Sequence, residues 1–273
     1  MKPIALMSPE EAAGVRYILM DIDDTLTREG KLPASSYAAL WKLKEAGLAV
    51  IPVTGRPAGW CDLIAREWPV DGVVGENGAL VFWEERAASP AESRAKSRPV
   101  LKAEYHPNAV RNNHPVLERI KQRALGEFPA MRIAKDQFAR LFDLALDFAE
   151  EEPVLPLSVA KRVRAIAEEE GAVAKISSIH VNVWMGSYDK LSMAERFLAK
   201  RFGWESGKGD REVVFVGDSP NDEPMFARFP LACAVANVSR YEGLIKHLPA
   251  YVASKECGEG FAEIAETILK KRP

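Results

Sequence analysis

The sequence predicts an α/β protein with a Rossmann-like, doubly wound parallel sheet and a second, smaller α+β unit inserted into it. Short apolar runs of strand-forming residues alternate with helix-length periodic segments from the start of the chain. After residue 85 a stretch with few large apolar residues interrupts this pattern, and residues 100–184 then form a separate α/β pattern. We therefore expect a core made of residues 1–85 and 187–273, and an inserted domain over residues 86–186.

The composition is that of a globular protein with no nucleic-acid or membrane partner. The 273 residues allow a sizeable core, and 47% hydrophobic with 28% charged residues fits a globular chain. The net charge of −2 predicts no nucleic-acid surface, and no apolar run approaches the roughly 18 residues of a membrane helix. Cys61, Cys233 and Cys257 lack metal-type spacing, and no signal peptide is recognisable, so we expect reduced thiols and a cytoplasmic protein. Monomer and homodimer both stay open.

The chain is organised around residues 18–27, where an apolar strand ends in three carboxylates and a threonine. Side chains alternate along a strand, so Asp21 and Asp23 fall on the same side and emerge at its carboxyl end. In open α/β sheets ligands bind at that end. Two close carboxylates need a cation, a shared proton or a basic side chain, and Mg²⁺ fits because it takes carboxylate, water and phosphate oxygens. The alternative is a solvated acidic turn.

A second strand, expected over residues 48–53, also ends in a polar turn. There Thr54 can hydrogen-bond a phosphoryl oxygen, and Gly55 lets a backbone N–H approach it closely. Arg56 follows, and Pro57 suits the first turn of the next helix. Ordinary turn chemistry explains this stretch equally well.

Turn and cap signals place the neighbouring elements. Ser35 or Ser36 is expected to cap a helix that ends at Gly47. An Asn-Gly pair predicts a hairpin within residues 72–83. Residues 86–99, rich in Ala, Ser, Pro and basic residues, are expected to form a mobile surface loop.

The inserted domain is expected to contain strands over residues 100–105 and 142–148, helices over 116–128 and 157–170, and one or two strands over 175–184. The stretch 138–148 also suits a helix. We favour a strand over 142–148 because it places Asp143 and Asp147 on one polar face.

A helix expected over residues 190–202 carries the next candidate. Asp189 caps it and Gly203 ends it. Lys190 lies in its first turn, where the helix dipole disfavours a cation. This position indicates a partner of opposite charge nearby.

A buried strand over residues 212–216 leads into a second acidic turn. Asp218 and Asp222 lie four residues apart in this turn, with Asn221 between them, which suits an ion site at a strand tip. Strands over 231–236 and 251–252 and a helix over 261–271 are expected to complete the core.

Four of these stretches, in this order, resemble the four motifs of the haloacid dehalogenase superfamily of phosphohydrolases. They are the strand ending in Asp-x-Asp-x-Thr, the turn Thr54-Gly55, Lys190 at a helix start, and Gly-Asp-x-x-Asn-Asp over residues 217–222. Leu191 stands where the family commonly has glycine after the lysine. The inserted segment resembles the larger, type-2B cap domain of the branch that includes sugar-phosphate phosphatases.

The resemblance implies a role for each motif. Asp21 would be the nucleophile that forms an aspartyl-phosphate, and Asp23 would protonate the leaving alcohol and then activate water. Thr54 and Lys190 would hold the phosphoryl oxygens. Mg²⁺ would be held by Asp21, the backbone carbonyl of Asp23, Asp218 and, directly or through another ligand, Asp222, while Asn221 would orient Asp218 or Lys190.

The cap would select the substrate by closing over the core. The candidates for contact with the substrate are Arg56 at the boundary and Arg140, His180 and Asn182 within the cap. The plainer interpretations are a surface ion pair for Arg140 and a half-exposed strand histidine for His180.

The resemblance therefore implies a Mg²⁺-dependent phosphatase that acts on a small phosphorylated metabolite, a sugar or polyol phosphate being favoured. A phosphosugar mutase can share this core and cap, and a non-catalytic binding protein can share the fold. A signalling receiver domain also uses an acidic cluster with Thr/Ser and Lys, but it is much shorter and has no cap.

Overall fold

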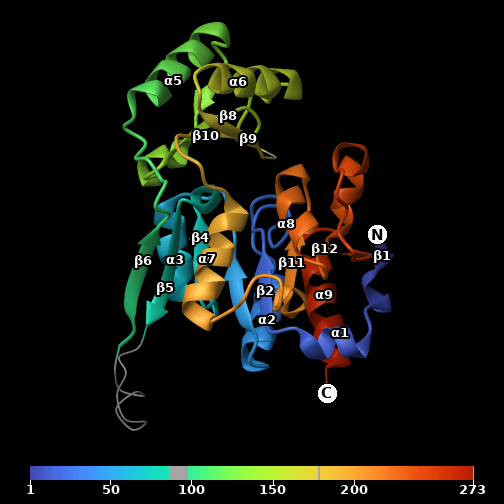
Figure 1. Cartoon of the computed structure of the whole chain (residues 1–273). Helices are drawn as coiled ribbons and strands as arrows, with labels where there is room; N and C mark the ends of the chain where they lie inside the picture. The colour runs from blue at the N-terminus through green and yellow to red at the C-terminus, as the bar shows by residue number, and fades with distance from the viewer. Residues whose placement is uncertain (86–97, 178, 273) are drawn as a thin grey trace.

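The computed structural model describes residues 1–85, 98–177 and 179–272, and its core is a six-stranded parallel sheet (Figure 1). The strand order is β1-β13-β12-β11-β2-β3, and every neighbouring pair is parallel. The strands are β1 (Lys2–Pro3), β2 (Tyr17–Met20), β3 (Ala49–Pro52), β11 (Val213–Gly217), β12 (Cys233–Ala234) and β13 (Tyr251–Val252). The predicted fold class is confirmed.

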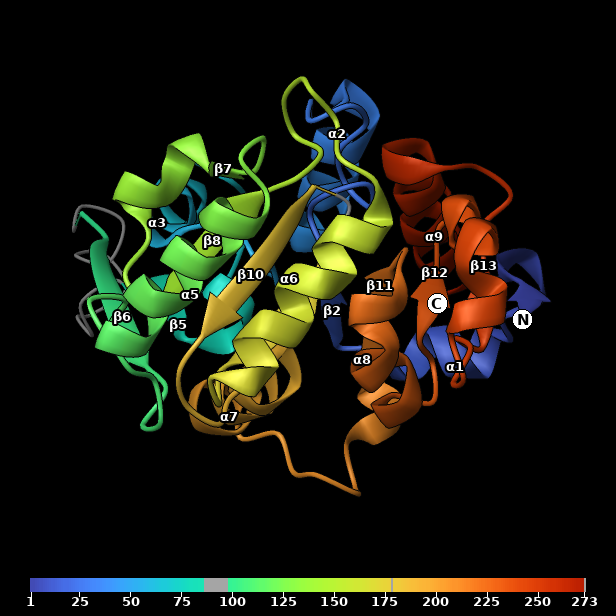
Figure 2. The same cartoon turned by 90° about the horizontal axis from the view of Figure 1, so that it is seen from above.

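The central strand β2 is apolar throughout because helices cover both faces of the sheet. Ile18 and Met20 pack on one side, and Tyr17 and Leu19 pack on the other. Figure 2 shows the sheet between two layers of helices. The first layer contains α1 (Pro9–Gly14), α2 (Ala34–Glu45), α3 (Ala58–Glu67) and α9 (Cys257–Lys271), and the second contains α7 (Lys190–Phe202) and α8 (Glu223–Arg228).

A hairpin extends this sheet beyond β3. The strand β4 (Val73–Gly75) touches the core sheet through a parallel bridge between Val53 and Val74. It then pairs with β5 (Leu80–Glu85), as the Asn-Gly signal predicted, and β5 pairs with β6 (Val100–Tyr105). The strand β6 thus lies beside the core hairpin, while the boundaries of the inserted domain stay a prediction.

A second, antiparallel sheet, which we call the cap sheet, has the order β7-β8-β10-β9. It consists of β7 (Arg132–Ile133), β8 (Asp143–Asp147), β9 (Val173–Ile176) and β10 (His180–Trp184). Leu144, Leu146, Val181 and Val183 pack beneath two helices, α5 (Pro115–Glu127) and α6 (Leu157–Glu169), that cover the face of the cap sheet away from the core (Figure 1). The other face therefore points toward the core.

That second face is polar although it is buried. Directly paired residues lie on the same face of a sheet, and the register pairs Asp147 with His180 and Ala145 with Asn182. Asp143 belongs to the same face, so the expected strand with its two acids on one side is confirmed. These side chains are buried because the core lies against them.

Several local expectations needed correction. Neither Ser35 nor Ser36 caps α2, because Pro33 precedes the helix and the hydroxyl of Ser36 donates to the carbonyl of Leu26 at 2.7 Å. The last helix begins at Cys257 rather than at residue 261. The short helices α1 and α8 were not expected. Short 3₁₀ turns occupy Ile4–Leu6, Glu76–Gly78, Lys135–Ala139, Asp210–Glu212, Pro220–Asp222 and Ala236–Leu244.

Other expectations were met. Gly47 has the left-handed backbone expected after a helix, and Asp189 and Gly203 cap α7 at its two ends. The expected loop at residues 86–99 lies, for 86–97, outside the described residues. Among the helices that the structure describes, none is long and apolar enough to cross a membrane.

A substitution at Gly78 can test how tightly the hairpin turn packs against α7. Its φ is +103°, and a Cβ atom there would lie 2.0 Å from the carbonyl oxygen of Asp189, just before Lys190. We expect Gly78→Ala to lower the free energy of unfolding by about 3 kcal/mol, because backbone strain and a clash add together. Thermal and denaturant unfolding measure this change.

Gly126→Ala is the control, since the added methyl group would meet no atom within 4 Å and the site lies inside α5. It should stay within about 1 kcal/mol of wild type, on the stabilising side. Equal stabilities for the two variants would contradict the packing described.

Candidate active site

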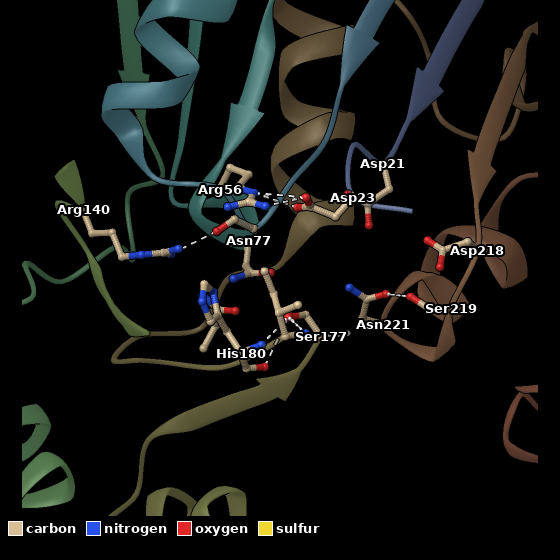
Figure 3. Close-up of a pocket in the computed structure, with 13 residues that line it drawn as sticks. Asp21, Asp23, Arg56, Asn77, Arg140, Ser177, His180, Asp218, Ser219 and Asn221 are labelled. Carbon is tan, nitrogen blue, oxygen red and sulfur yellow. Dashed lines mark hydrogen bonds and ion pairs between the residues drawn. The ribbon is translucent and has the colours of Figure 1, made fainter. Parts of the chain in front are cut away.

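The carboxyl ends of β2, β3 and β11 meet the polar face of the cap sheet around a cavity (Figure 3). The space between its atoms amounts to about 450 Å³ when the part open to solvent is included. The core side contributes Asp21, Asp23, Gly55, Arg56, Asn77, Asp218, Ser219 and Asn221, and the cap side contributes Arg140, Ser177, Ile179, His180 and Asn182. Nine of the twelve site residues predicted from the sequence thus line one cavity, while Thr54, Lys190 and Asp222 lie outside its lining.

Lys190 contacts Asp21, which lines the cavity, and joins two of the acidic motifs. Its ammonium group donates to Asp21 Oδ2 at 2.7 Å and to Asp222 Oδ1 at 3.1 Å, and all three side chains are buried. The backbone N–H of Ile22 donates to Asp21 Oδ1 at 2.8 Å, which holds the carboxylate in place. The expected partner of opposite charge for Lys190 is therefore present.

Asp218 completes the acidic cluster. Its carboxylate accepts a hydrogen bond from the hydroxyl of Thr25 at 3.0 Å and from the amide of Asn237 at 3.3 Å. Its own backbone N–H donates to Asp222 Oδ2 at 3.1 Å. Asn237 was missed by the sequence analysis, because it follows a two-residue strand and no motif spacing marks it.

The turn after β3 provides a backbone surface rather than an open hydroxyl. Thr54 is fully buried, and its Oγ1 accepts the N–H of Arg56 at 3.1 Å. Gly55 lines the cavity beside it. The hydroxyl of Ser219 donates to the side-chain carbonyl of Asn221, so Asn221 faces the cavity without a direct bond to Lys190 or Asp218 among the described residues.

Arg56 connects Asp23 with the cap. Its guanidinium group forms a two-pronged ion pair with Asp23, at 2.9 Å from Nε to Oδ2 and 2.7 Å from Nη2 to Oδ1. Its Nη1 lies 3.5 Å from Glu150 and 3.9 Å from Asp136, which both belong to the cap. The guanidinium also stacks over Trp60, 4.4 Å from the ring centre. Arg56 is thus a link across the boundary, as its predicted position implied.

The cap residues form two further clusters. Arg140 is buried, donates to Asp143 at 3.0 Å and also to the carbonyl of Gly55 at 3.0 Å. Asn182 donates to the same Asp143 carboxylate at 2.9 Å. Arg140 is therefore not in a surface ion pair: it fastens the cap to the Thr54-Gly55 turn of the core.

His180 is buried rather than half-exposed, and its Nε2 lies 2.8 Å from Glu150 Oε2. Glu150 also contacts Arg56, so a line of charged contacts runs from His180 to Asp23. The partner of His180 was not predicted, because Glu150 lies thirty residues away in a run of acids without periodicity.

Glu76 is a second boundary residue that the sequence analysis did not single out. Its carboxylate accepts the N–H groups of Leu141 at 2.8 Å, Phe142 at 2.6 Å and Asp143 at 3.2 Å in the cap. It also accepts the N–H of Ala58 at the start of α3, at 2.9 Å. One fully buried carboxylate thus joins the core to the first residues of β8.

Burial and charge crowding shift the ionisation of these groups. Burial, opposed by Lys190 and aided by Asp222, raises the pKa of Asp21 to about 7. Burial and the neighbouring Asp222 and Asp21 raise the pKa of Asp218 well above its ordinary value. Burial alone would lower the pKa of Lys190, but Asp21 and Asp222 together raise it.

The cap boundary shows the same competition. Burial and the nearby Asp143 raise the pKa of Glu76 to about 7, against the opposing effect of its backbone donors. The hydrogen bond from His180 lowers the pKa of Glu150 to about 2 although partial burial opposes it. Asp21 and Asp218 therefore stand out as carboxylates that need further positive charge.

A family model of haloacid dehalogenase-like hydrolases matches residues 18–101, which include Asp21, Asp23 and the Thr54-Gly55-Arg56 turn. Over these residues the chain is similar to the haloacid dehalogenase superfamily. The superfamily resemblance stated from the motifs is thereby confirmed.

Several relatives match nearly the whole length of this chain. A phosphoglycolate phosphatase of Pyrobaculum neutrophilum is 27% identical over 261 residues, which are 94% of this chain and 96% of that protein. The crystal structure of a Thermoplasma acidophilum protein matches 94% of this chain and 98% of its own, with a TM-score of 0.68 and 22% identity. The sucrose-phosphatase of Synechocystis, solved with sucrose and phosphate, matches 94% and 97% with a TM-score of 0.61 and 14% identity. The two structures show the shared fold.

The cluster of three buried carboxylates beside Lys190 fits a divalent metal ion. Asp21, Asp218 and Asp222 each offer a carboxylate oxygen, and these oxygens lie within 4.8 Å of one another. All three side chains are buried, and Lys190 is the cation that contacts two of them, so negative charge is left over. Oxygen ligands without sulfur or imidazole favour a hard ion of the Mg²⁺ type. Burial and neighbouring carboxylates raise the pKa of Asp21 and of Asp218, and a bound cation would lower both by stabilising the charged forms.

Removal of the ion should therefore be visible in stability. We expect Mg²⁺ to raise the Tm of wild type relative to EDTA, because an ion at 100 times its Kd adds about 2.7 kcal/mol to the folded state. Asp218→Asn should lose most of this increase, while Glu242→Gln, at an exposed acid, should keep it. Equal Tm values of wild type in Mg²⁺ and EDTA would contradict the metal site.

Glu76 offers a separate test of the link between core and cap. In Glu76→Gln an NH₂ group replaces one oxygen and faces backbone donors, so we expect a loss of about 2–4 kcal/mol of stability. Amide hydrogen exchange should become faster at Leu141, Phe142 and Asp143. The exposed Glu266→Gln, which removes a surface ion pair with Lys42, is the control. Unchanged exchange at the three amides would show that Glu76 does not hold the cap.

Proposed function

We propose that this phosphatase of the haloacid dehalogenase superfamily depends on Mg²⁺ and hydrolyses a small phosphorylated metabolite through an aspartyl-phosphate. The observation that supports the proposal most is the buried Asp21 carboxylate, held by Lys190 and the Ile22 N–H next to two further carboxylates. A phosphate ester bound in the cavity would meet this carboxylate at the strand tip, where parallel α/β sheets bind ligands.

Asp21 acts as the nucleophile in this proposal. One of its oxygens attacks phosphorus, the ester P–O bond breaks, and the phosphoryl group is carried on Asp21. Lys190 and the N–H groups of the Gly55 turn stabilise the negative charge on the phosphoryl oxygens, since donors in a buried site act strongly on such charge. The bound Mg²⁺, held by Asp21, Asp218, Asp222 and the carbonyl of Asp23, would offset the charge between the carboxylate and the phosphate.

Asp23 moves the protons. It donates a proton to the leaving oxygen, and the resulting carboxylate then takes a proton from the water that hydrolyses the aspartyl-phosphate. Arg56 holds the Asp23 carboxylate in a two-pronged ion pair, and this pair opens when Asp23 takes up the proton that it donates. Because the same arginine reaches Glu150 of the cap, the position of Asp23 is tied to the closed arrangement of cap and core.

The substrate is a compact polar ester. The cap presents Arg140, Ser177, His180 and Asn182 to the cavity, and Ile179 is the apolar lining residue on that side among the residues that the structure describes. These groups suit hydroxyl or carboxylate oxygens of a leaving group, as in a sugar phosphate, a polyol phosphate or 2-phosphoglycolate. The relative named as a phosphoglycolate phosphatase and the sucrose-phosphatase of the same fold support this range.

The decisive experiment measures phosphate release from a panel of sugar phosphates, polyol phosphates, 2-phosphoglycolate, nucleotides and an aryl phosphate, with Mg²⁺ or EDTA. We expect release that requires Mg²⁺, and Asp21→Asn should lower kcat by at least about 10³-fold because the nucleophile is gone. Asp62→Asn, on the exposed face of α3 with Arg66 as its partner, is the matched control and should keep full activity.

Release that survives in Asp21→Asn would rule out Asp21 as the nucleophile. If well-folded wild type releases phosphate from no ester of the panel, a non-catalytic binding protein is favoured. Activity on a sugar phosphate that appears after addition of a sugar bisphosphate would instead identify a phosphosugar mutase.

A further inference from the structure

The turn Glu76–Gly78 lies between the two groups to which we assign the phosphoryl oxygens. On one side the backbone N–H of Asn77 donates to the carbonyl of Thr54 at 3.1 Å. On the other side Gly78 packs against the start of α7, where its Cβ position is 3.0 Å from the backbone nitrogen of Lys190. Asn77 is therefore fixed between the Thr54-Gly55 turn and Lys190.

The side chain of Asn77 is buried, and its amide nitrogen has no partner in the part of the chain that the structure describes. It is 6% exposed, and its Nδ2 has no hydrogen-bond partner among the residues that the structure describes. Buried amide groups nearly always have a partner, because losing water without replacing its hydrogen bonds costs free energy. An unpaired amide in this position indicates that a partner from outside the chain is expected.

The direction of the amide identifies where that partner would lie. Asn77 lines the cavity together with Asp21, Gly55 and Asn221, and Figure 3 shows it between Arg56 of the core and His180 of the cap. Its Oδ1 and Nδ2 lie almost equally near Gly55, at 3.1 and 3.3 Å from the Cβ position of that residue. The amide end of Asn77 thus lies beside Gly55, which lines the cavity, and a half-turn about χ2 exchanges the positions of its oxygen and its NH₂ group.

We propose that Asn77 is a further substrate-contacting residue, whose side-chain N–H donates to a phosphoryl oxygen. The inference rests on the proposed phosphatase function, in which Gly55 and Lys190 bind that group. An amide suits this position because it donates without adding charge to a site where Lys190 already offsets two carboxylates. The competing explanation is that Asn77 serves the turn alone, since asparagine tolerates its φ of +55°.

Two substitutions separate the amide from the backbone. Asn77→Gly removes the side chain while keeping a residue that accepts a positive φ without strain. Asn77→Asp keeps the shape but replaces the donor by a negatively charged acceptor, which repels phosphate. Glu29→Gly is the matched control, because Glu29 also has a positive φ, of +50°, and is exposed in the turn before α2.

The probe is inorganic phosphate in the presence of Mg²⁺, with binding measured by calorimetry and inhibition measured with the best ester of the panel. We expect Asn77→Gly to weaken phosphate binding about tenfold, because it removes an N–H donor to a charged acceptor. Asn77→Asp should weaken phosphate binding about a hundredfold, because it also places a negative charge beside the phosphate. The kcat/KM for the ester should fall by similar factors. Glu29→Gly should bind phosphate as wild type does.

Phosphate binding within twofold of wild type in a folded Asn77→Gly would overturn the proposal and leave Asn77 as a turn residue. Unchanged phosphate binding with a raised KM for the ester would also overturn it, by moving the contact to the leaving group. Because calorimetry needs no turnover, a wild type that binds phosphate without hydrolysing any ester would refute the phosphatase function and not the Asn77 contact.

Discussion

The structure depends on the balance of buried charge at the carboxyl edge of the parallel sheet. Lys190 contacts Asp21 and Asp222 in a region closed to solvent, and Asp218 lies within reach of both acids. Buried carboxylates without compensation are costly, so Lys190 stabilises this edge and a further cation would stabilise it more. In the proposed function a metal ion makes up this deficit of positive charge, and Lys190 would then hold a phosphoryl oxygen.

The elements around this edge are arranged to maintain the balance. The capped N-terminus of α7 supplies Lys190 although the helix dipole disfavours a cation there, and the tight packing of Gly78 keeps that helix start in place. Asn237, which follows the neighbouring strand β12, holds Asp218 and donates to the carbonyl of Asp24. Segments more than two hundred residues apart are thus joined by single side chains.

The boundary between core and cap follows a related principle. One face of the cap sheet is apolar and packs beneath α5 and α6, and the other is polar yet buried against the core. Glu76, Arg56 and Arg140 satisfy the polar groups there by hydrogen bonds and ion pairs across the boundary. A boundary built this way closes in one geometry, because any shift would leave buried charges unpaired.

Individual residues show how far the sequence could lead. The strands ending at Asp21 and Asp218 were predictable because apolar runs followed by acids mark buried strands that end at a polar edge. The start of α7 was predictable because Asp189 and Gly203 act within a few residues of the helix that they cap. Glu76 and Asn237 were not, since each acts on a distant segment. The exposure assigned to His180 was wrong because burial depends on the core that covers the cap sheet.

The sequence by itself determined the fold class, the order of the motifs and the residue types at the strand tips, because periodicity, caps and turns are local properties of the chain. The tertiary structure decided which charges meet, which carboxylates lose their water, and that the Asn77 amide nitrogen, beside the Thr54-Gly55 turn, has no partner among the described residues. These properties depend on distances between segments that only folding brings together, so no local pattern can record them.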